Sequence, residues 1–208
     1  MRRTFILAVI MAMVLGFSMQ AHATLELRGM DVNGNRLIYD TDFNITWYDY
    51  TNSSDWQNQL NWASALSVSG GDLVGVYDDW RLPTALNQNG TGPCTGYSCT
   101  GSEMGHLYYT ELGNSTSSSL TETGDFQHLQ LGFYWSSTEY AALASNAWYF
   151  YTDDGSQLTS NKGFPLYAIA VRSGDVSVAV VPEPMSMVLF GVGAAVFGAR
   201  RMVIRRRG

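Results

Sequence analysis

Asp78-Asp79-Trp80-Arg81-Leu82-Pro83-Thr84 is the densest group of bulky and charged residues in a chain otherwise rich in Gly, Ser, Thr and Asn. Pro83 restricts the residue before it to an extended conformation, so this stretch enters the fold as a rigid arm. Trp80 and Leu82 are typical core residues, and the five fixed donors of Arg81 suit a buried or half-buried clamp on carbonyls or a carboxylate. We therefore expect the arm to organise the fold. A ligand-binding role for the same residues is the alternative.

The N-terminus has the parts of a secretory signal peptide. They are, in order, Arg2 with Arg3, the apolar run 5–17 and the small-x-small pattern Ala21-His22-Ala23. We expect residues 1–23 to be removed by cleavage after Ala23, so that the exported chain begins at Thr24. An uncleaved anchor is the alternative, and it is disfavoured because the apolar run is short for a membrane span.

The C-terminal residues 182–208 have the features of a second targeting signal. Pro182-Glu183-Pro184 is followed by an apolar stretch, residues 185–199, and by a tail with five arginines. These three parts in this order resemble the PEP-CTERM sorting signal of Gram-negative bacteria. The prolines keep the tripeptide extended. We expect residues 185–199 to form a short transmembrane helix in the inner membrane, while the arginines hold the end of the chain in the cytoplasm.

The resemblance implies that a membrane-embedded exosortase cuts near the tripeptide and passes the protein to the cell surface or to extracellular polysaccharide. The implied partners are the secretion machinery, the exosortase and, transiently, the inner membrane. An ordinary C-terminal anchor is the alternative. Residues 185–199 are fewer than the ~20 apolar residues of a stable span, which favours a transient anchor.

Removing both targeting signals leaves a strongly acidic domain, residues 24–181. Of the 12 Lys and Arg residues, two lie in the signal peptide and five in the tail, and of the 18 Asp and Glu residues only Glu183 is lost, so the domain has a net charge near −12. Such a surface repels nucleic acid and other polyanions. It suits neutral or cationic partners or divalent cations, although it is also a common means to solubility.

Cys94 and Cys99 are the two cysteines of the chain and lie in a Gly-rich segment, residues 87–101. In an exported protein this spacing predicts a disulfide that closes a loop. Two thiols without a nearby His make a poor metal site, so we expect the pair to be structural.

Turn signals and hydrophobic periodicity predict strands at both ends of the domain and two helices between them. Asn33-Gly34 favours a two-residue hairpin turn, and Asp55 is a candidate N-cap. The expected strands are 25–30, 36–39, 45–48, 147–151, 157–161 and 167–173, and the expected helices are 55–66 and 103–112. Strands, then helices, then strands again indicate an α+β fold with antiparallel sheets and long loops.

Few residues suggest chemistry. His106 has no matched carboxylate, Cys or second His in the sequence pattern, so we expect a surface or satisfied residue. Residues 31–42 have the acidic spacing of a calcium loop, but Arg36 stands where that loop requires Gly, which favours a hairpin. The pairs Asp78-Asp79 and Asp153-Asp154 suggest a glycan-active enzyme, but adjacent carboxylates on a strand point to opposite faces. No catalytic fingerprint is present, so we expect no catalytic residues.

Three motifs in order resemble the domain family named after the C-terminal domain of a bacterial collagen-like adhesin, Lcl. They are Asp79-Trp80-Arg81-Leu82-Pro83-Thr84, Tyr134-Trp135-Ser136-Ser137-Thr138 with Ala147-Trp148, and Ala170-Val171-Arg172. The resemblance covers nearly all of residues 30–175. It implies a C-type-lectin-like fold, with two helices packed on antiparallel sheets and an extended loop region.

The resemblance also implies that the motif residues hold the fold. Arg81 and Arg172 would be buried anchors, and Trp135 and Trp148 would belong to the core. The adhesin domain is associated with sulfated polysaccharides through a basic surface. The charge near −12 of this domain departs from that pattern, so sulfated glycans are not expected here.

These observations favour a non-catalytic binding or adhesion module at the cell surface or in exopolysaccharide. Tyr97, Tyr140 or Tyr151 could stack on sugar rings, and the sequence identifies no other ligand-binding residue. No cofactor is expected, although a cluster of acidic side chains in the folded surface would make binding depend on calcium. A purely structural envelope protein and an enzyme acting on surface glycans are the alternatives.

Overall fold

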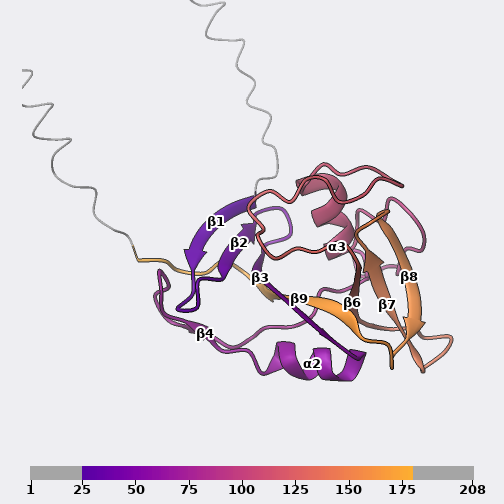
Figure 1. Ribbon diagram of the computed structural model, residues 1–208, viewed down its shortest axis with the longest axis horizontal. Helices are drawn as coiled ribbons and strands as arrows, with labels where there is room; N and C mark the ends of the chain where they lie inside the picture. Colours follow the sequence, from indigo (N-terminus) through magenta and orange to yellow (C-terminus); the bar gives the residue numbers. More distant parts are fainter. Residues whose placement is uncertain (1–24, 180–208) are drawn as a thin grey trace, which may run out of the picture. The chain divides into compact units, whose positions relative to one another are not determined.

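The computed structural model describes residues 25–179, which form a seven-stranded sheet with a helical element against each face (Figure 1). The predicted signal peptide, the tripeptide Pro182-Glu183-Pro184 and the predicted helix 185–199 lie outside the described residues. None of the helices within residues 25–179 has the length and apolar character needed to cross a membrane.

The strands of the main sheet are arranged in the order β1-β2-β3-β9-β6-β7-β8. Their bounds are β1 Leu25–Met30, β2 Arg36–Asp40, β3 Ile45–Ser54, β6 Phe133–Glu139, β7 Asn146–Tyr151, β8 Ser156–Asn161 and β9 Leu166–Ser173. Two short strands, β4 Val68–Ser69 and β5 Val76–Tyr77, form a separate small sheet. The predicted mixture of strands and helices is present, and the fold is mainly β-sheet.

The expectation of purely antiparallel sheets is wrong at one place, the contact between β6 and β9. These strands run parallel and pair at Tyr134 and Tyr167. The last strand of the domain inserts between β3 and β6 and lies antiparallel to β3. Because β9 is antiparallel to β3 on one side and parallel to β6 on the other, the sheet is mixed.

The central strand β9 divides the hydrophobic core into two layers. Ala168 and Ala170 face one cluster of buried side chains, whereas Ile169 and Val171 face the other. All four side chains are fully buried. Side chains alternate between the faces of a strand, so a strand buried on both sides carries a continuous apolar run instead of alternating polar residues.

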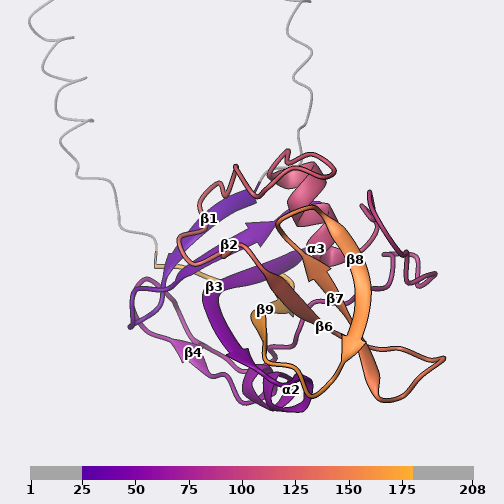
Figure 2. The same cartoon turned by 45° about the vertical axis from the view of Figure 1, so that its right-hand side comes forward.

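Helix α2, Trp56–Ser64, covers the first face together with the arm. Trp80 and Leu82 of the arm are buried there beside Trp56 and Ala63 of the helix. The helix is shorter than the predicted 55–66, because the Asp55 side chain accepts the hydrogen bond of an N-cap and Ala65 already ends the last turn. Figures 1 and 2 place α2 and the second helical segment on opposite sides of the sheet.

The second helical segment covers the other face and changes its geometry partway. It begins as α3, Glu103–His106, and continues as a π-helix, η1, Leu107–Glu111. Beyond it, the N–H of Leu112 donates to the carbonyl of Leu107 at 2.9 Å, an i→i+5 bond. The sequence predicted a regular α-helix over 103–112, so the location is as expected and the hydrogen-bond register differs.

The first hairpin joins β1 to β2 around Asp31. Met30 pairs with Arg36 across the ladder, so the connection has five residues and the predicted two-residue turn is wrong. The Asp31 carboxylate accepts hydrogen bonds from the N–H groups of Asn33 and Asn35 and from the Tyr48 hydroxyl. These hydrogen bonds stabilise the five-residue loop, and they occupy the Asp31 carboxylate within the hairpin.

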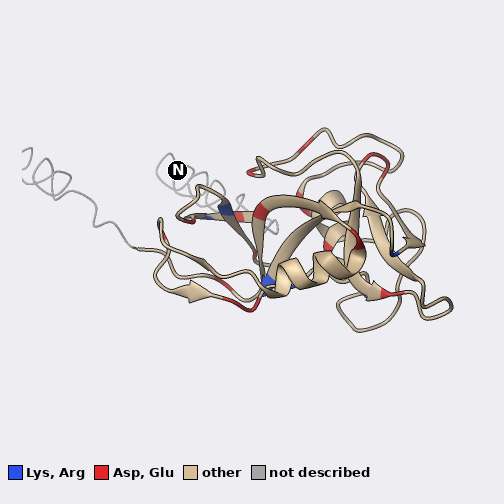
Figure 3. Ribbon diagram, turned by 60° about the horizontal axis from the view of Figure 1, so that its bottom comes forward, with Lys and Arg blue, Asp and Glu red and all other residues tan. Residues whose placement is uncertain are grey.

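The five Lys and Arg side chains of the domain each form an ion pair with a carboxylate. The pairs are Arg28 with Glu26 and Asp175, Arg36 with Asp125, Arg81 with Glu103, Lys162 with Glu139, and Arg172 with Asp79. Figure 3 shows basic residues at few places and acidic residues at many. All five basic side chains are therefore paired, and the domain keeps an excess of acidic side chains without a basic partner.

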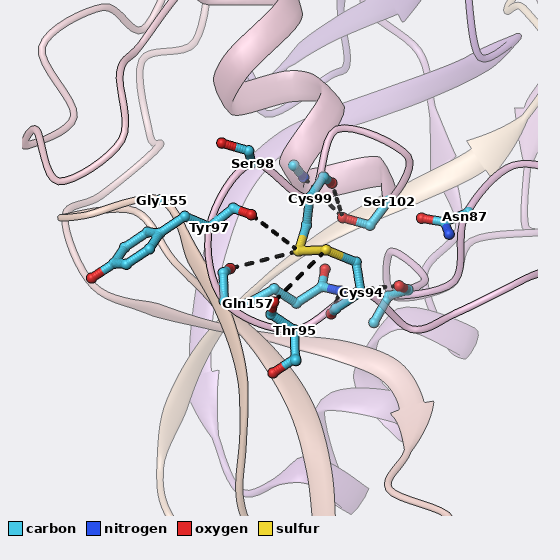
Figure 4. The surroundings of a disulfide bond; sticks show 12 residues. Asn87, Cys94, Thr95, Tyr97, Ser98, Cys99, Ser102, Gly155 and Gln157 are labelled. Carbon is cyan, nitrogen blue, oxygen red and sulfur yellow. Dashed lines mark hydrogen bonds between the residues drawn. A yellow bond between two sulfur atoms is a disulfide. The ribbon is translucent and has the colours of Figure 1, made fainter.

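The Cys94–Cys99 disulfide is present and closes a loop against the edge strand β8 (Figure 4). Gly96 and Gln157 exchange two backbone hydrogen bonds of 2.9 and 2.8 Å. The buried Gln157 amide also donates to the carbonyls of Ala85 and Cys94. The loop thus covers part of an edge that would otherwise expose unpaired backbone groups.

Candidate functional site

The three sequence motifs meet at one junction in the middle of the fold. The backbones of Arg81 and Val171 exchange hydrogen bonds of 2.9 and 2.8 Å, which attaches the arm to β9. Two residues further, the N–H of Ser137 in β6 donates to the carbonyl of Pro83 at 2.8 Å. Segments far apart in the sequence are therefore joined through the arm.

The Arg81 side chain clamps the arm to the second helical segment. Its two terminal nitrogens donate to the two carboxylate oxygens of Glu103 at 2.8 and 2.6 Å. Glu103 also accepts from the N–H of Thr84 at 2.7 Å and is 4% exposed, whereas the Arg81 side chain is 38% exposed. The hydrogen bond with Glu103 raises the pKa of Arg81. This is a half-buried, charge-matched, bidentate pair.

The aromatic and serine residues of the second motif lie inside the protein. Trp135 is fully buried and Trp148 nearly so. The Ser136 hydroxyl donates to the carbonyl of Trp148 at 3.0 Å, and the Trp56 indole N–H donates to the carbonyl of Ser136 at 2.8 Å. The polar groups of Ser136 are thus occupied by other residues of the fold, whereas the buried indole nitrogen of Trp135 has no hydrogen-bond partner among the described residues.

Arg172 completes the junction from β9. Its guanidinium donates to both oxygens of Asp79 at 2.7 and 3.1 Å and lies 4.8 Å from the centre of the Tyr77 ring. The hydrogen bond with Arg172 lowers the pKa of Asp79. The Arg172 side chain is 13% exposed, and Asp79 is 52% exposed. The motif residues thus bind one another, and a ligand site has to be sought elsewhere.

A partly exposed group of aromatic rings lies on the β6–β7–β8 part of the sheet, and we call Phe133, Tyr149 and Tyr151 the aromatic platform. Phe133 is 39% exposed, whereas Tyr149 and Tyr151 are half-buried. The Phe133 and Tyr151 rings are stacked, with centroids 4.0 Å apart and planes 14° apart. Tyr149 meets Phe133 edge to face at 5.3 Å. Leu158, 39% exposed, lies opposite Tyr149 on β8 and extends the apolar surface. The neighbours of these residues within the strands point into the core.

A shallow hollow of about 210 Å³ adjoins the platform at Phe133. Its other lining residues are Ser53, Gly132, Pro165, Leu166 and Tyr167. On the opposite side, the Tyr151 hydroxyl donates to Asp153 at 3.0 Å. Hydrogen bonding to Asp153 raises the pKa of Tyr151, and burial raises that of Tyr149, so both phenols are neutral donors at pH 7. The site combines apolar ring faces with hydrogen-bonding groups at its rim.

The three tyrosines that the sequence proposed for sugar stacking lie in different surroundings. Tyr151 belongs to the platform. Tyr97 is 49% exposed, and its hydroxyl lies 3.5 Å from a carboxylate oxygen of Asp154. Tyr140 packs edge to face against Trp148. Phe133 and Tyr149 were not among the predicted stacking residues, although alternation along β7 indicates that Tyr149 shares a face with Tyr151.

The two acidic pairs are divided between separate tasks. Asp154 accepts the N–H of Ser156 at 2.8 Å and forms the β7–β8 turn, while Asp153 binds Tyr151. Asp79 pairs with Arg172, whereas Asp78 is exposed. In each pair the two carboxylates therefore contact different groups and do not converge on one site.

A second polar group lies in the interior and joins Asp40, His106 and Glu111. The Nε2 atom of His106 is 3.0 Å from Oε1 of Glu111 and 3.8 Å from Oδ2 of Asp40. The three side chains are 7% exposed or less. The expectation that His106 has no matched carboxylate is wrong. Asp40 lies on a distant strand, and Glu111 stands in a register that a regular helix does not predict.

The fold defines the class of this protein as a mainly β domain with a mixed sheet, whose motif residues meet at one internal junction. Residues 36–172 match the Lcl C-terminal domain family, and the chain therefore belongs to that family. Residues 180–207 match the PEP-CTERM protein-sorting motif. The chain is thus an exported exosortase substrate of the Gram-negative type, anchored transiently in the membrane. No curated protein and no solved structure matches it.

Proposed function

We propose that the domain is a non-catalytic binding module of the cell surface or exopolysaccharide layer, with a C-type-lectin-like arrangement, and that the aromatic platform binds neutral polysaccharide. The stacking of the exposed Phe133 ring on the half-buried Tyr151 ring is the observation that carries this proposal. Sugar rings have apolar C–H faces that pack against aromatic rings. The hydroxyl groups at the edges of a sugar need partners, and the rim around Tyr151 and Asp153 offers them.

The charge of the domain supports a neutral glycan over an anionic one. The net charge is near −12, and the five basic side chains are already paired. Asp153 and Asp154 lie at the end of the strand that carries Tyr149 and Tyr151. A sulfated or carboxylated chain would meet repulsion here, whereas an uncharged chain loses nothing.

A polysaccharide array tests the proposal with the full-length chain in mild detergent. We expect the wild type to bind neutral glycans with equal strength in calcium and in chelator, because aromatic stacking needs no ion. The double variant F133S/Y151S should lose at least tenfold in binding. Tyr50→Ser is the matched control, since Tyr50 is 41% exposed but lies on β3 beside Trp62.

Each outcome of the array has a clear meaning. Equal losses in the Tyr50 control and in the platform variant would contradict a site at the platform. Binding that disappears with chelator would replace ring stacking with a calcium-dependent site. Absence of binding under all conditions would favour the structural envelope protein over the binding module.

A further inference from the structure

The Asp40–His106–Glu111 cluster has more negative charge than the protein neutralises. Two carboxylates face one imidazole, and the five Lys and Arg side chains of the domain pair with other carboxylates. With both acids ionised, one negative charge remains in the interior even when His106 is protonated. Buried charge is strongly unfavourable unless a counter-charge or hydrogen bonds compensate it.

Asp40 provides an independent sign that something is bound here. Its Oδ1 accepts hydrogen bonds from the N–H groups of Asp42 and Phe43 at 3.0 and 2.9 Å, which fixes the orientation of the carboxylate. Its Oδ2 has no hydrogen-bond partner, although the side chain is 0% exposed. This oxygen points toward the cluster and lies 3.8 Å from Nε2 of His106. Buried polar atoms in folded proteins are nearly always satisfied.

The π-helix places the third ligand. In a regular α-helix the residue stacked over His106 is Thr110, at i+4, and Glu111 would lie away from it. The wider turn of η1 changes this register, and Oε1 of Glu111 comes within 3.0 Å of Nε2 of His106. Single π-turns inside helices are rare and are frequent at functional sites.

Hydrogen bonding alone does not explain the arrangement. Nε2 carries at most one hydrogen, and at 3.0 Å it serves Glu111, so Asp40 stays without a partner. The Phe43 ring stacks on the imidazole, with centroids 3.8 Å and planes 14° apart, and holds its orientation. One cation between the three side chains would satisfy the Asp40 oxygen and the excess charge together.

We propose that Asp40, His106 and Glu111 bind a divalent transition-metal ion, with zinc the expected one, which joins the end of β2 to the α3–η1 segment. One nitrogen and two carboxylate donors suit zinc, whereas calcium and magnesium prefer oxygen ligands alone. Tetrahedral zinc with bonds of ~2.0–2.2 Å holds its ligand atoms about 3.4 Å apart. The three donor atoms lie within 4.8 Å of one another, so small side-chain rotations complete the site.

Metal analysis and thermal unfolding of the full-length chain test the site. The protein carries a tag without histidine, is stripped with chelator and is then titrated with zinc, calcium or magnesium chloride. We expect one zinc per chain by mass spectrometry of the metal content. With free zinc at 100 times Kd, the Tm should rise by about 5–10 °C, while calcium and magnesium produce a rise of less than 1 °C.

Two ligand variants and one control separate this site from general histidine or carboxylate binding. Asp40→Asn and His106→Gln should each abolish the zinc-induced rise in Tm. His128→Gln should keep it, because His128 belongs to a separate His–carboxylate pair with Asp49. The metal-free Tm of each variant shows whether it folds. A wild type that neither binds zinc nor shifts its Tm at 100 μM, or a folded Asp40→Asn that keeps the full shift, would overturn the proposal.

Discussion

The two ends of the α3–η1 segment both link the helix to the sheet through a buried acid, but they do so in opposite ways. At the N-terminal end, Glu103 has a bidentate arginine and a backbone N–H for its oxygens. At the C-terminal end, Glu111 and Asp40 share one imidazole, and an oxygen of Asp40 has no partner. The first end is complete within the chain, and the second becomes complete only with a cation.

A structural clamp and a binding site differ here in the balance of their charges and not in their burial. Burial is similar at both ends, since Glu103 is 4% exposed and Glu111 1%. What differs is the balance between charges and the number of satisfied oxygens. Removing a charge from a balanced pair leaves its partner uncompensated, whereas removing one from an unbalanced cluster relieves it. The signs of mutational effects should therefore differ between the two ends.

Arg81→Ala should have the largest effect. The substitution leaves Glu103 buried without a counter-charge and detaches the arm. We expect a loss of about 2–4 kcal/mol in the free energy of unfolding, which is less than for a fully buried ion pair because Arg81 is partly exposed. Urea denaturation of the full-length chain measures it. Arg81→Lys, which cannot bind both oxygens in a fork, should recover less than half. A loss below 0.5 kcal/mol would mean that the clamp is not structural.

Asp31→Asn should have the next largest effect. Asp31 is a buried acid without a counter-charge, but its oxygens accept five hydrogen bonds. Burial alone would raise the Asp31 pKa, but the bonds from Tyr48, Asn35 and Asn33 together lower it below 3.8. Its stabilisation is therefore fully present above pH 3.8 and is lost as the pH falls through the lowered pKa. We expect a loss of about 1–2 kcal/mol at pH 7.

The pH dependence of that difference is the check. Denaturation of wild type and Asp31→Asn from pH 7 to pH 2 should show two stabilities that converge below pH 3.8. A difference that is independent of pH would show that the variant acts through packing and not through the charged hydrogen bonds.

Glu111→Gln should have a smaller effect of opposite sign in the metal-free protein. Removing one of two neighbouring carboxylates relieves their repulsion, so we expect stability to be unchanged or increased by up to about 1 kcal/mol. The same chemical change at the other end, Glu103→Gln, should be destabilising. Thermal unfolding of both variants in chelator compares them directly. Two losses of equal size would remove the distinction between the two ends.

The platform variant F133S/Y151S should have the smallest effect on stability, about 0.5 kcal/mol per residue, because Phe133 is exposed and Tyr151 is only half-buried. The variant should remove the aromatic platform without disturbing the junction of the three motifs. Circular dichroism and urea denaturation measure this, next to the array. A loss as large as that of Arg81→Ala would make the platform part of the core.

Much of the architecture was predictable because it depends on local signals. The apolar run of β9, the Asp55 cap and the Cys94–Cys99 pair each act over a few residues, and each is found where the sequence indicated. The first hairpin shows the limit of such signals. Asn33-Gly34 predicts a short turn, but the Asp31 carboxylate binds two N–H groups of the loop and a tyrosine from β3, and this makes the turn longer.

The candidate sites depended on contacts between distant residues. Phe133 and Tyr151 lie on paired strands, and only the register of β6 against β7 stacks their rings. Asp40 and Glu111 come from a strand and a helix, and no spacing along the chain relates them. The parallel pairing of β6 and β9 has the same origin, since it follows from where the last strand inserts.

The sequence by itself determined the sorting motif, the acidic character of the domain, its family and the residues of its arm. These properties follow from composition and from short motifs whose chemistry is local. The tertiary structure decided which acids are neutralised and which are not. Long-range packing sets the dielectric surroundings and the partners of each charge, so Glu103 and Glu111, eight residues apart in the chain, become a clamp and a proposed metal ligand.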